Sequence, residues 1–146
     1  MAYRVAIVDD SQADAGLVSG ILEHWAENWQ LDVRWETFSS AESFLFAYAG
    51  DKQWDILLLD VEMGAMDGVT MAKRVRRDNE AVQIVFITGY SDYIAEGYEV
   101  AALHYLVKPV KEEKLLTVLD RALKKRSLRH AGGCPWCLRH SGEAGR

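Results

Sequence analysis

Cysteine is almost missing from this chain. Its 146 residues include two cysteines, Cys134 and Cys137, and both lie near the C-terminal end. The rest of the chain therefore cannot be held by a disulfide framework, and a buried core must stabilise it. A chain of this length forms such a core as one domain. The composition, 49% hydrophobic and 27% charged, is ordinary for a globular protein.

Long apolar runs are missing as well. The N-terminal stretch MAYRVAIVDD contains only a short apolar run that ends in acidic residues. It is therefore neither a signal peptide nor a membrane span. The chain also has no internal repeat and no low-complexity segment. We expect a cytoplasmic protein that does not contact a membrane.

Positive charge is scarce over most of the chain. Residues 1–120 carry 10 Lys and Arg against 21 Asp and Glu, whereas residues 121–146 carry 7 against 1. The acidic body argues against nucleic-acid binding by the body itself. The basic run RALKKRSLRH at 121–130 is typical of a solvated helix end, and contact with DNA or an acidic partner is the alternative.

Short apolar runs alternate with helical patterns. The runs predict five strands, at residues 3–8, 31–38, 55–60, 83–89 and 103–109. Apolar residues at helical spacing predict a helix after each strand. The first helix is expected to be capped by Ser11 and the second by Ser39 or Ser40. The other three are expected at residues 68–78, 91–100 and 111–126. Right-handed crossovers place helices on both faces of one parallel sheet. The sequence therefore predicts a doubly wound α/β domain with a five-stranded parallel sheet and five helices.

Chemically active side chains stand at the ends of these strands. Asp9 and Asp10 end the first strand, Asp60 the third, Thr88 the fourth and Lys108 the fifth. Sites in doubly wound folds lie at the carboxyl ends of the strands, so we expect these residues to converge. Clustered carboxylates repel one another and need a cation. Their hard oxygen atoms suit Mg²⁺.

These positions suggest a role for each residue. Asp9 and Asp10 are candidate magnesium ligands, and Asp60 is a candidate nucleophile that attacks phosphorus to form an acyl phosphate. Lys108 would neutralise the incoming charge, and Thr88 would donate a hydrogen bond to a phosphoryl oxygen. Each residue alone has an ordinary explanation: Asp10 can cap the first helix, Thr88 can simply favour a strand and Lys108 can lie on the surface. Their conjunction favours the functional interpretation.

Four segments together resemble the receiver domain of two-component response regulators: IVDD, LLLDVEMGAMDG, FITG and HYLVKP. The resemblance extends from Tyr3 to about Arg126. It implies a flavodoxin-like receiver domain at residues 1–126, followed at 127–146 by a linker or the start of a truncated effector domain. It implies a signalling switch, not an enzyme, that catalyses only its own phosphorylation and dephosphorylation.

The resemblance also implies a site. Asp60 would be the phospho-acceptor that receives the phosphoryl group from a sensor histidine kinase. The cofactor would be Mg²⁺, bound directly by Asp10, through water by Asp9, and by Asp60 and the backbone carbonyl of Glu62. Lys108 would contact the phosphate.

Activation is implied by the same resemblance. Thr88 and Tyr105 would form a switch pair, and Lys108–Pro109 would be a cis bond. Phosphorylation would remodel the face formed by the predicted helix at 91–100, the last strand and the last helix. This face would form a homodimer or bind an effector.

A finer resemblance, at residues 84–110, is to receivers that precede LytTR-type DNA-binding domains. DNA would then be bound only by an effector domain that this chain does not contain. One departure concerns Gly64-Ala65, where the family often has Pro-Gly. We expect a different conformation of the loop after Asp60, because Gly lacks the rigidity of Pro and Ala does not freely adopt positive φ.

Other functions fit less well. An aspartate-nucleophile phosphatase would need a D-x-D motif on the first strand, and VDDSQ does not supply it. A pseudo-receiver that no longer takes phosphate is the main alternative, and the complete set of acids, Thr88 and Lys108 disfavours it. The CPWC motif lacks the context of a zinc or redox site. His24 and His104 are expected to be structural.

Overall fold

The computed structural model describes residues 3–61, 63, 66–89 and 102–131. Its strands are β1 (Tyr3–Val8), β2 (Val33–Phe38), β3 (Ile56–Leu59), β4 (Gln83–Thr88) and β5 (His104–Val107). Its helices are α1 (Gln12–Trp29), α2 (Ala41–Gly50), α3 (Gly68–Asp78) and α5 (Glu112–Ala131). The helix predicted at 91–100 lies outside the described residues.

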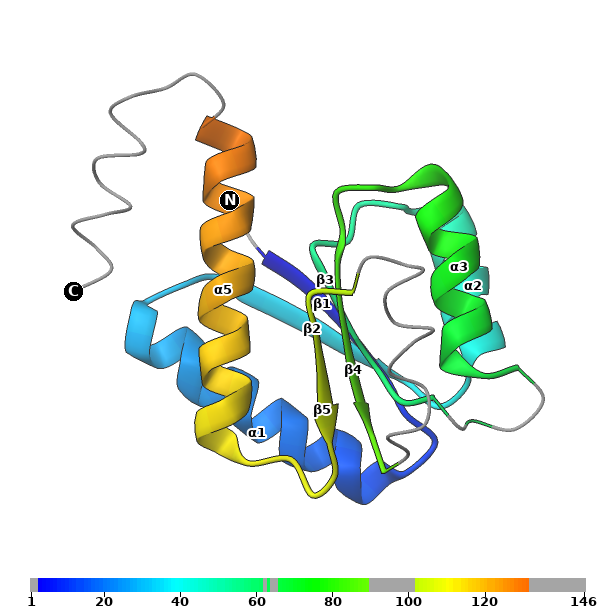
Figure 1. The fold of residues 1–146 in the computed structure, drawn as a ribbon, viewed down its shortest axis with the longest axis horizontal. Coiled ribbons are helices and arrows are strands. Elements are labelled where there is room, and N and C mark those ends of the chain that lie inside the picture. Colours follow the sequence, from blue (N-terminus) through cyan, green and yellow to red (C-terminus); the bar gives the residue numbers. More distant parts are fainter. Residues whose placement is uncertain (1–2, 62, 64–65, 90–101, 132–146) are drawn as a thin grey trace.

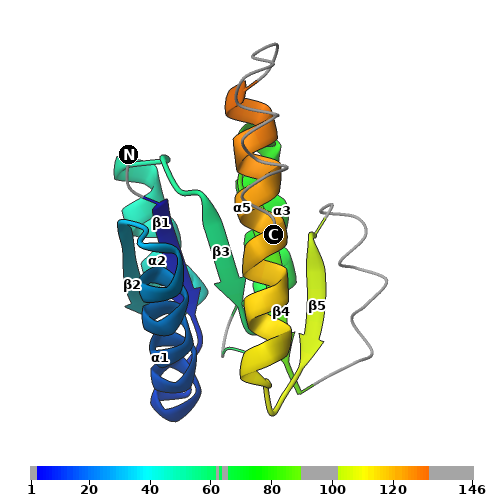
Figure 2. The ribbon, with the colours of Figure 1, turned by 90° about the vertical axis from the view of Figure 1, so that its left-hand side faces the viewer.

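The five strands form one parallel sheet in the order β2-β1-β3-β4-β5. This order is that of the flavodoxin-like doubly wound fold, so the predicted fold class is confirmed. Helices α1 and α5 cover one face of the sheet, and α2 and α3 cover the other (Figures 1 and 2). Among the described residues, no helix has both the length and the apolar character needed to cross a membrane.

Two apolar cores lie on opposite faces of the sheet. Along β1, Val5 and Ile7 point into the core beneath α1 and α5, whereas Ala6 and Val8 point into the core beneath α2 and α3. Successive side chains of a strand point to opposite faces, so a strand covered on both sides is apolar at every position. The continuous run of β3, ILLL, is completely buried for the same reason.

Side chains at the helix starts fix the loops of the site. Ser11 is the N-cap of α1 and its hydroxyl accepts a hydrogen bond from the backbone N–H of Asp14 at 3.3 Å. The alternative in which Asp10 caps this helix is therefore wrong. Asp67 caps α3 by accepting from the N–H of Thr70 at 2.7 Å.

Two details differ from the sequence pattern. Leu17 shares the helical spacing of the buried face of α1 but is 49% exposed, because it lies on the rim of that face. Helix α5 continues to Ala131 instead of ending near residue 126. No Gly or Pro interrupts the chain between Lys111 and Ala131, so nothing local stops the helix earlier.

Candidate functional site

The site lies at the carboxyl ends of the strands, at the lower edge of the sheet in Figure 1. Backbone hydrogen bonds extend the sheet by one residue there. The N–H of Asp60 donates to the carbonyl of Val8 at 2.9 Å, and the N–H of Lys108 donates to the carbonyl of Thr88 at 2.8 Å. The sheet itself therefore fixes where the Asp60 and Lys108 side chains begin.

Three carboxylates meet at this edge. Asp9, Asp10 and Asp60 each offer an oxygen atom, and these atoms lie within 4.8 Å of one another. Asp9 and Asp60 are buried, whereas Asp10 is exposed and open to water. Hard oxygen donors with access to water are what Mg²⁺ requires, so the donor set fits this ion. Glu62, the other expected ligand, lies outside the described residues.

Lys108 binds the cluster with its ammonium group. Its Nζ donates to Asp9 Oδ2 at 2.9 Å, to Asp14 Oδ2 at 2.8 Å and to Asp60 Oδ2 at 3.2 Å. Only 19% of the Lys108 side chain is exposed, so the surface interpretation of this residue is wrong. The Lys108–Pro109 peptide bond is cis, as the family resemblance implied.

Two pKa values in the site are shifted upward. Burial is the largest cause of the raised pKa of Asp9, and the nearby charge of Asp60 adds to it, while hydrogen bonds from Lys108 and Ser11 act in the opposite direction. Burial by itself lowers the pKa of Lys108, but the hydrogen bonds to Asp14 and Asp9 and the charge of Asp60 outweigh it and raise the pKa. Lys108 is thus firmly protonated at neutral pH.

Sequence reasoning missed Asp14. This residue lies in the first turn of α1, whereas the site residues were predicted from the ends of strands. Its hydrogen bond with Lys108 lowers the pKa of Asp14. The signal that would have found it is the spacing from Ser11. An acid three residues after an N-cap stands at the start of the helix, beside the carboxyl end of the preceding strand.

Gly68 lets α3 pack closely against the site. Its N–H donates to the carbonyl of Val61 at 2.7 Å. A Cβ at this position would collide with the backbone carbonyl of Asp60. Glycine is therefore required by the close approach of the two backbones. Gly64-Ala65, where the sequence departs from the family pattern, lies outside the described residues.

Thr88 and Tyr105 occupy neighbouring strands on the same face of the sheet. Thr88 is completely buried, and Tyr105 is half-buried. The register pairs Phe86 with Tyr105 and Thr88 with Val107, so Thr88 and Tyr105 are diagonal neighbours across the two strands. The ring of Tyr105 lies 5.8 Å from the ring of Phe86, centroid to centroid. This arrangement is suited to a coupled movement of the two side chains.

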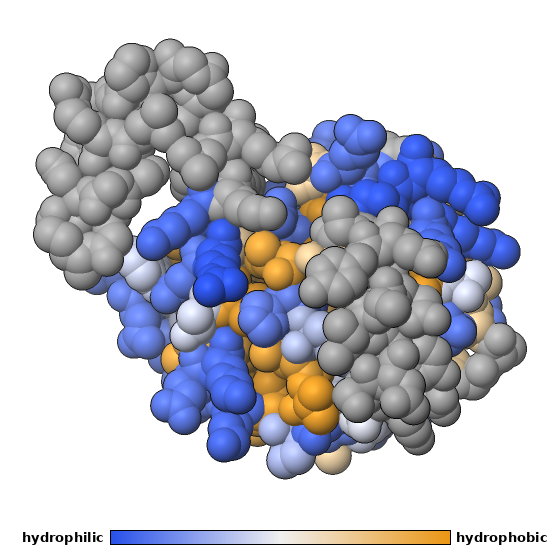
Figure 3. Space-filling model, in the orientation of Figure 1, coloured by the Kyte–Doolittle hydropathy of each residue, from blue (hydrophilic) through white to orange (hydrophobic). Residues whose placement is uncertain are grey.

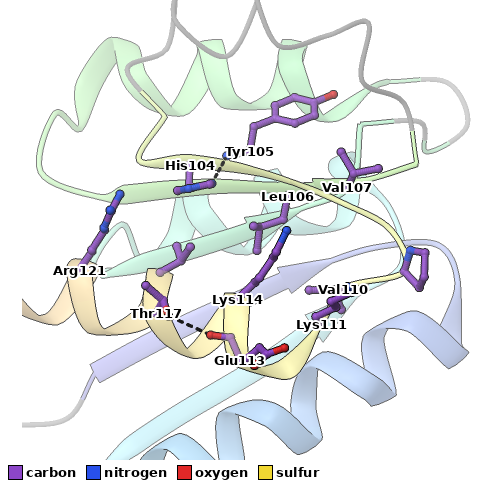
Figure 4. A pocket seen from close by; sticks show the side chains of 12 residues that line it. His104, Tyr105, Leu106, Val107, Val110, Lys111, Glu113, Lys114, Thr117 and Arg121 are labelled. Atoms are coloured by element: carbon purple, nitrogen blue, oxygen red, sulfur yellow. Dashed lines mark hydrogen bonds between the residues drawn. The ribbon is translucent and has the colours of Figure 1, made fainter.

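A groove of about 560 Å³ runs between β5 and α5. Apolar side chains line it, among them Leu106, Val110 and Val118, and Lys114 and Arg121 add positive charge (Figure 4). The space-filling view shows the apolar surface as a stripe beside the hydrophilic residues of α5 (Figure 3). Val107, also in the lining, is 50% exposed. The groove is separate from the acidic cluster.

Together, the fold and the cluster define a doubly wound α/β domain with an acidic, lysine-containing site at the carboxyl edge of its sheet. Residues 5–120 match the family described as the response regulator receiver domain, and the chain belongs to this family. The family resemblance found in the sequence is thereby confirmed.

Two bacterial regulatory proteins are similar in sequence to this chain over most of its length. The transcriptional regulatory protein NatR of Bacillus subtilis is 27% identical over 124 residues, which are 85% of this chain and 51% of NatR. The sensory transduction protein LytT of the same organism is 32% identical over 121 residues, which are 83% of this chain and 48% of LytT. The chain spans about half the length of these two relatives.

Solved structures share the fold. The receiver domain of an HD domain-containing protein from Pseudomonas fluorescens superposes with a TM-score of 0.76 at 21% identity, covering 87% of this chain and 99% of that one. The N-terminal domain of a response regulator/sensory box/GGDEF 3-domain protein from Carboxydothermus hydrogenoformans superposes with a TM-score of 0.73 at 26% identity, covering 88% of this chain and 98% of that one.

Proposed function

We propose that this domain is a phosphorylation-activated switch in which Asp60 accepts a phosphoryl group from the phosphohistidine of a sensor histidine kinase. The observation that carries the proposal is the meeting of Asp9, Asp10, Asp60 and Lys108 at one edge of the sheet. Membership of the receiver family supports it. We expect the switch to work in the cytoplasm, where ATP supplies the kinase.

The proposed reaction is a transfer between two nucleophiles. A carboxylate oxygen of Asp60 attacks phosphorus, a P–O bond forms, and the P–N bond to the kinase histidine breaks. The released nitrogen keeps the electron pair of that bond. Lys108 and Thr88 donate hydrogen bonds to phosphoryl oxygens, and Lys108 balances part of their charge.

A magnesium ion would complete the charge balance. Asp10, Asp9, Asp60 and the carbonyl of Glu62 are the groups that we propose to hold it. When bound, Mg²⁺ supplies positive charge against the oxygens of the transferred group. The exposed position of Asp10 supports an ion that keeps some of its water.

We propose that the output is read on the face that includes β5 and α5. Thr88 moves toward the phosphoryl group, Tyr105 follows inward, and the altered face forms a homodimer or binds an effector. The apolar groove beside Lys114 and Arg121 supports a protein partner there. DNA binding would belong to an effector domain, as in a transcriptional regulator of LytTR type.

The test is phosphorylation by acetyl phosphate and Mg²⁺, followed by intact-mass spectrometry. The wild type should gain the mass of one phosphoryl group, whereas D60N should not. D67N is the matched control, because Asp67 is a carboxylate that caps α3 and Asn caps equally well. Chelation of Mg²⁺ should stop the reaction.

Other outcomes would support other functions. A folded wild type that gains no phosphoryl group would favour the pseudo-receiver, an interaction module that does not take phosphate. Rapid multiple turnover of organophosphates would favour a phosphatase. Phosphorylation of D60N at the wild-type rate would contradict the assignment of Asp60.

A further inference from the structure

Among the described residues, Asp14 is the carboxylate partner of Lys108 that the proposed phosphotransfer does not use. Its Oδ2 accepts the shortest of the three hydrogen bonds from Nζ, at 2.8 Å. We propose that Asp14 is a positioning residue that holds Lys108 before phosphorylation and releases it when Asp60 carries a phosphoryl group. This inference rests on the proposed function of Asp60, and it adds a residue that limits the rate at which Asp60 is phosphorylated.

The donors of Lys108 are fully used before phosphorylation. An ammonium group has three N–H donors. Asp9, Asp14 and Asp60 accept one each, at 2.9, 2.8 and 3.2 Å. A phosphoryl group on Asp60 brings strong acceptor oxygens and additional negative charge. Lys108 can therefore bind the phosphoryl group only if one of its partners gives way.

Asp14 is the partner that is easiest to release. Its side chain is 42% exposed, against 7% for Asp9 and 9% for Asp60. A carboxylate that already faces water loses little when it returns to water, whereas a buried one is left unpaired. Asp9 is also held through Oδ1, which accepts from the N–H of Ser11 at 2.9 Å.

The Asp14 carboxylate interacts with the side chain of Ser11, but it does not close a capping box at the start of α1. In a capping box, the acid three residues after the N-cap accepts from the N–H of the N-cap residue. Here that N–H, on Ser11, donates to Asp9 instead. The cap of α1 uses the backbone N–H of Asp14, which a substitution of its side chain leaves in place.

Asp14 also adds negative charge where an anionic phosphodonor must enter. Four carboxylates lie at this site: Asp9, Asp14 and Asp60 accept from Lys108, and Asp10 stands beside Asp9 and Asp60. Replacing Asp14 by Asn reduces the repulsion of the donor and weakens the hold on one N–H of Lys108, because an amide oxygen accepts less strongly than a carboxylate. Both effects act in the same direction, toward faster phosphorylation.

The first experiment compares two phosphodonors in the presence of Mg²⁺. We expect D14N to raise kcat/KM for phosphorylation by acetyl phosphate roughly fivefold. The gain in kcat/KM should be smaller with phosphoramidate, because this donor carries less negative charge. D14E should restore the wild-type ratio of kcat/KM for acetyl phosphate to kcat/KM for phosphoramidate. E27Q removes an exposed charge from the same helix about 20 Å further along and should change nothing.

The second experiment needs no variant. The ¹³Cγ signal of Asp14 is followed by NMR in the wild type during titration with beryllofluoride and Mg²⁺. We expect it to move to the position of a carboxylate in free water as Lys108 turns to the beryllofluoride. In the first experiment, a gain in kcat/KM over wild type that differs between the two donors cannot come from a role of Asp14 in folding alone.

The results separate this inference from the function on which it rests. A wild type that takes no phosphoryl group overturns both. A wild type that is phosphorylated on Asp60, together with equal kcat/KM for D14N and wild type with both donors, overturns only the role of Asp14. An Asp14 signal that stays in place during the beryllofluoride titration overturns its release from Lys108.

Discussion

Asp60 engages both of its carboxylate oxygens before any phosphoryl group arrives. Oδ1 accepts from the backbone N–H of Val61 at 2.7 Å, and Oδ2 accepts from Lys108 at 3.2 Å. The first bond is short and local, whereas the second is the longest of the three made by Lys108. Single contacts of this kind set the orientation of the acceptor, and they depend on the position of the backbone around Asp60.

Gly68 is the residue on which that backbone depends most directly. We predict that G68A lowers the free energy of unfolding by about 1–3 kcal/mol, because its Cβ would meet the carbonyl oxygen of Asp60. It should also slow phosphorylation, since Asp60 would have to shift. Urea denaturation and the acetyl phosphate assay measure the two effects.

The matched control is G16A. Gly16 lies in α1, and a Cβ there meets no atom within 4 Å. Alanine is favoured over glycine inside a helix, so this variant should be more stable by about 0.5–1 kcal/mol. Similar losses in G68A and G16A would show that close approach to Asp60 is not the cause.

At the scale of elements, α1 and α5 are joined by polar contacts at two places along α5, at Asp120 and at Glu112. Asp120 Oδ1 accepts from the indole N–H groups of Trp25 and Trp29, both at 3.0 Å. Nearer the site, His24 Nδ1 lies 2.9 Å from Glu112 Oε2. The helix that begins after Lys108 is therefore attached to the helix that carries Asp14.

The pair of His24 and Glu112 makes this attachment sensitive to pH. The hydrogen bond and charge of Glu112 raise the pKa of His24 above its ordinary value of about 6.5. The contribution to stability is therefore complete below the unfolded-state pKa and is lost as pH rises through the folded-state pKa. It is small, because both side chains are largely exposed.

NMR titration of His24 measures this effect. We predict that E112Q returns the pKa of His24 toward its ordinary value, whereas E113Q, at the neighbouring exposed acid, leaves it raised. An unchanged pKa in E112Q would mean that other acids of α1 cause the shift.

Element positions followed the local pattern well. The buried run of β3 and the Ser11 cap agree with the local pattern, and of the two candidates for the second cap the structure has Ser40. The cis bond before Pro109 agrees with what the family resemblance implied. The end of α5 did not agree with its prediction, because no Gly or Pro lies within the helix before Ala131, and it is Gly132 and Gly133 that follow its last residue in the sequence.

At the scale of the whole molecule, one ionised carboxylate of the site, that of Asp9, is held at a cost to the stability of the fold. Burial raises the pKa of Asp9, so the folded protein binds a proton up to a higher pH than the unfolded chain does. The ionised carboxylate therefore destabilises the fold at neutral pH. A bound cation would reverse this cost, since a ligand of the folded state alone adds to its stability.

We predict that the effect of D9N on stability depends on magnesium. In the absence of Mg²⁺, D9N should raise the free energy of unfolding, because it removes a negative charge whose burial is unfavourable. With millimolar Mg²⁺, the wild type should gain stability and D9N should gain less. Thermal unfolding with and without the ion measures both.

The control for this prediction is E36Q. Glu36 is exposed on the edge strand β2, so its substitution should change stability by less than about 0.5 kcal/mol and leave the magnesium response intact. A D9N protein that is stabilised by Mg²⁺ as much as the wild type would rule out a contribution of Asp9 to the ion site.

The sequence by itself determined the order of the elements, the fold class and the strand ends where Asp9, Asp60 and Lys108 stand. These features follow from local periodicity and from the rule that parallel strands share one carboxyl edge. The full set of partners of Lys108 was decided only by the tertiary structure. The contacts with Asp9, Asp14 and Asp60 join positions 99, 94 and 48 residues apart. No local pattern encodes such distances, because it is the packing of α1 against the sheet that contains β5 that brings Asp14 to Lys108.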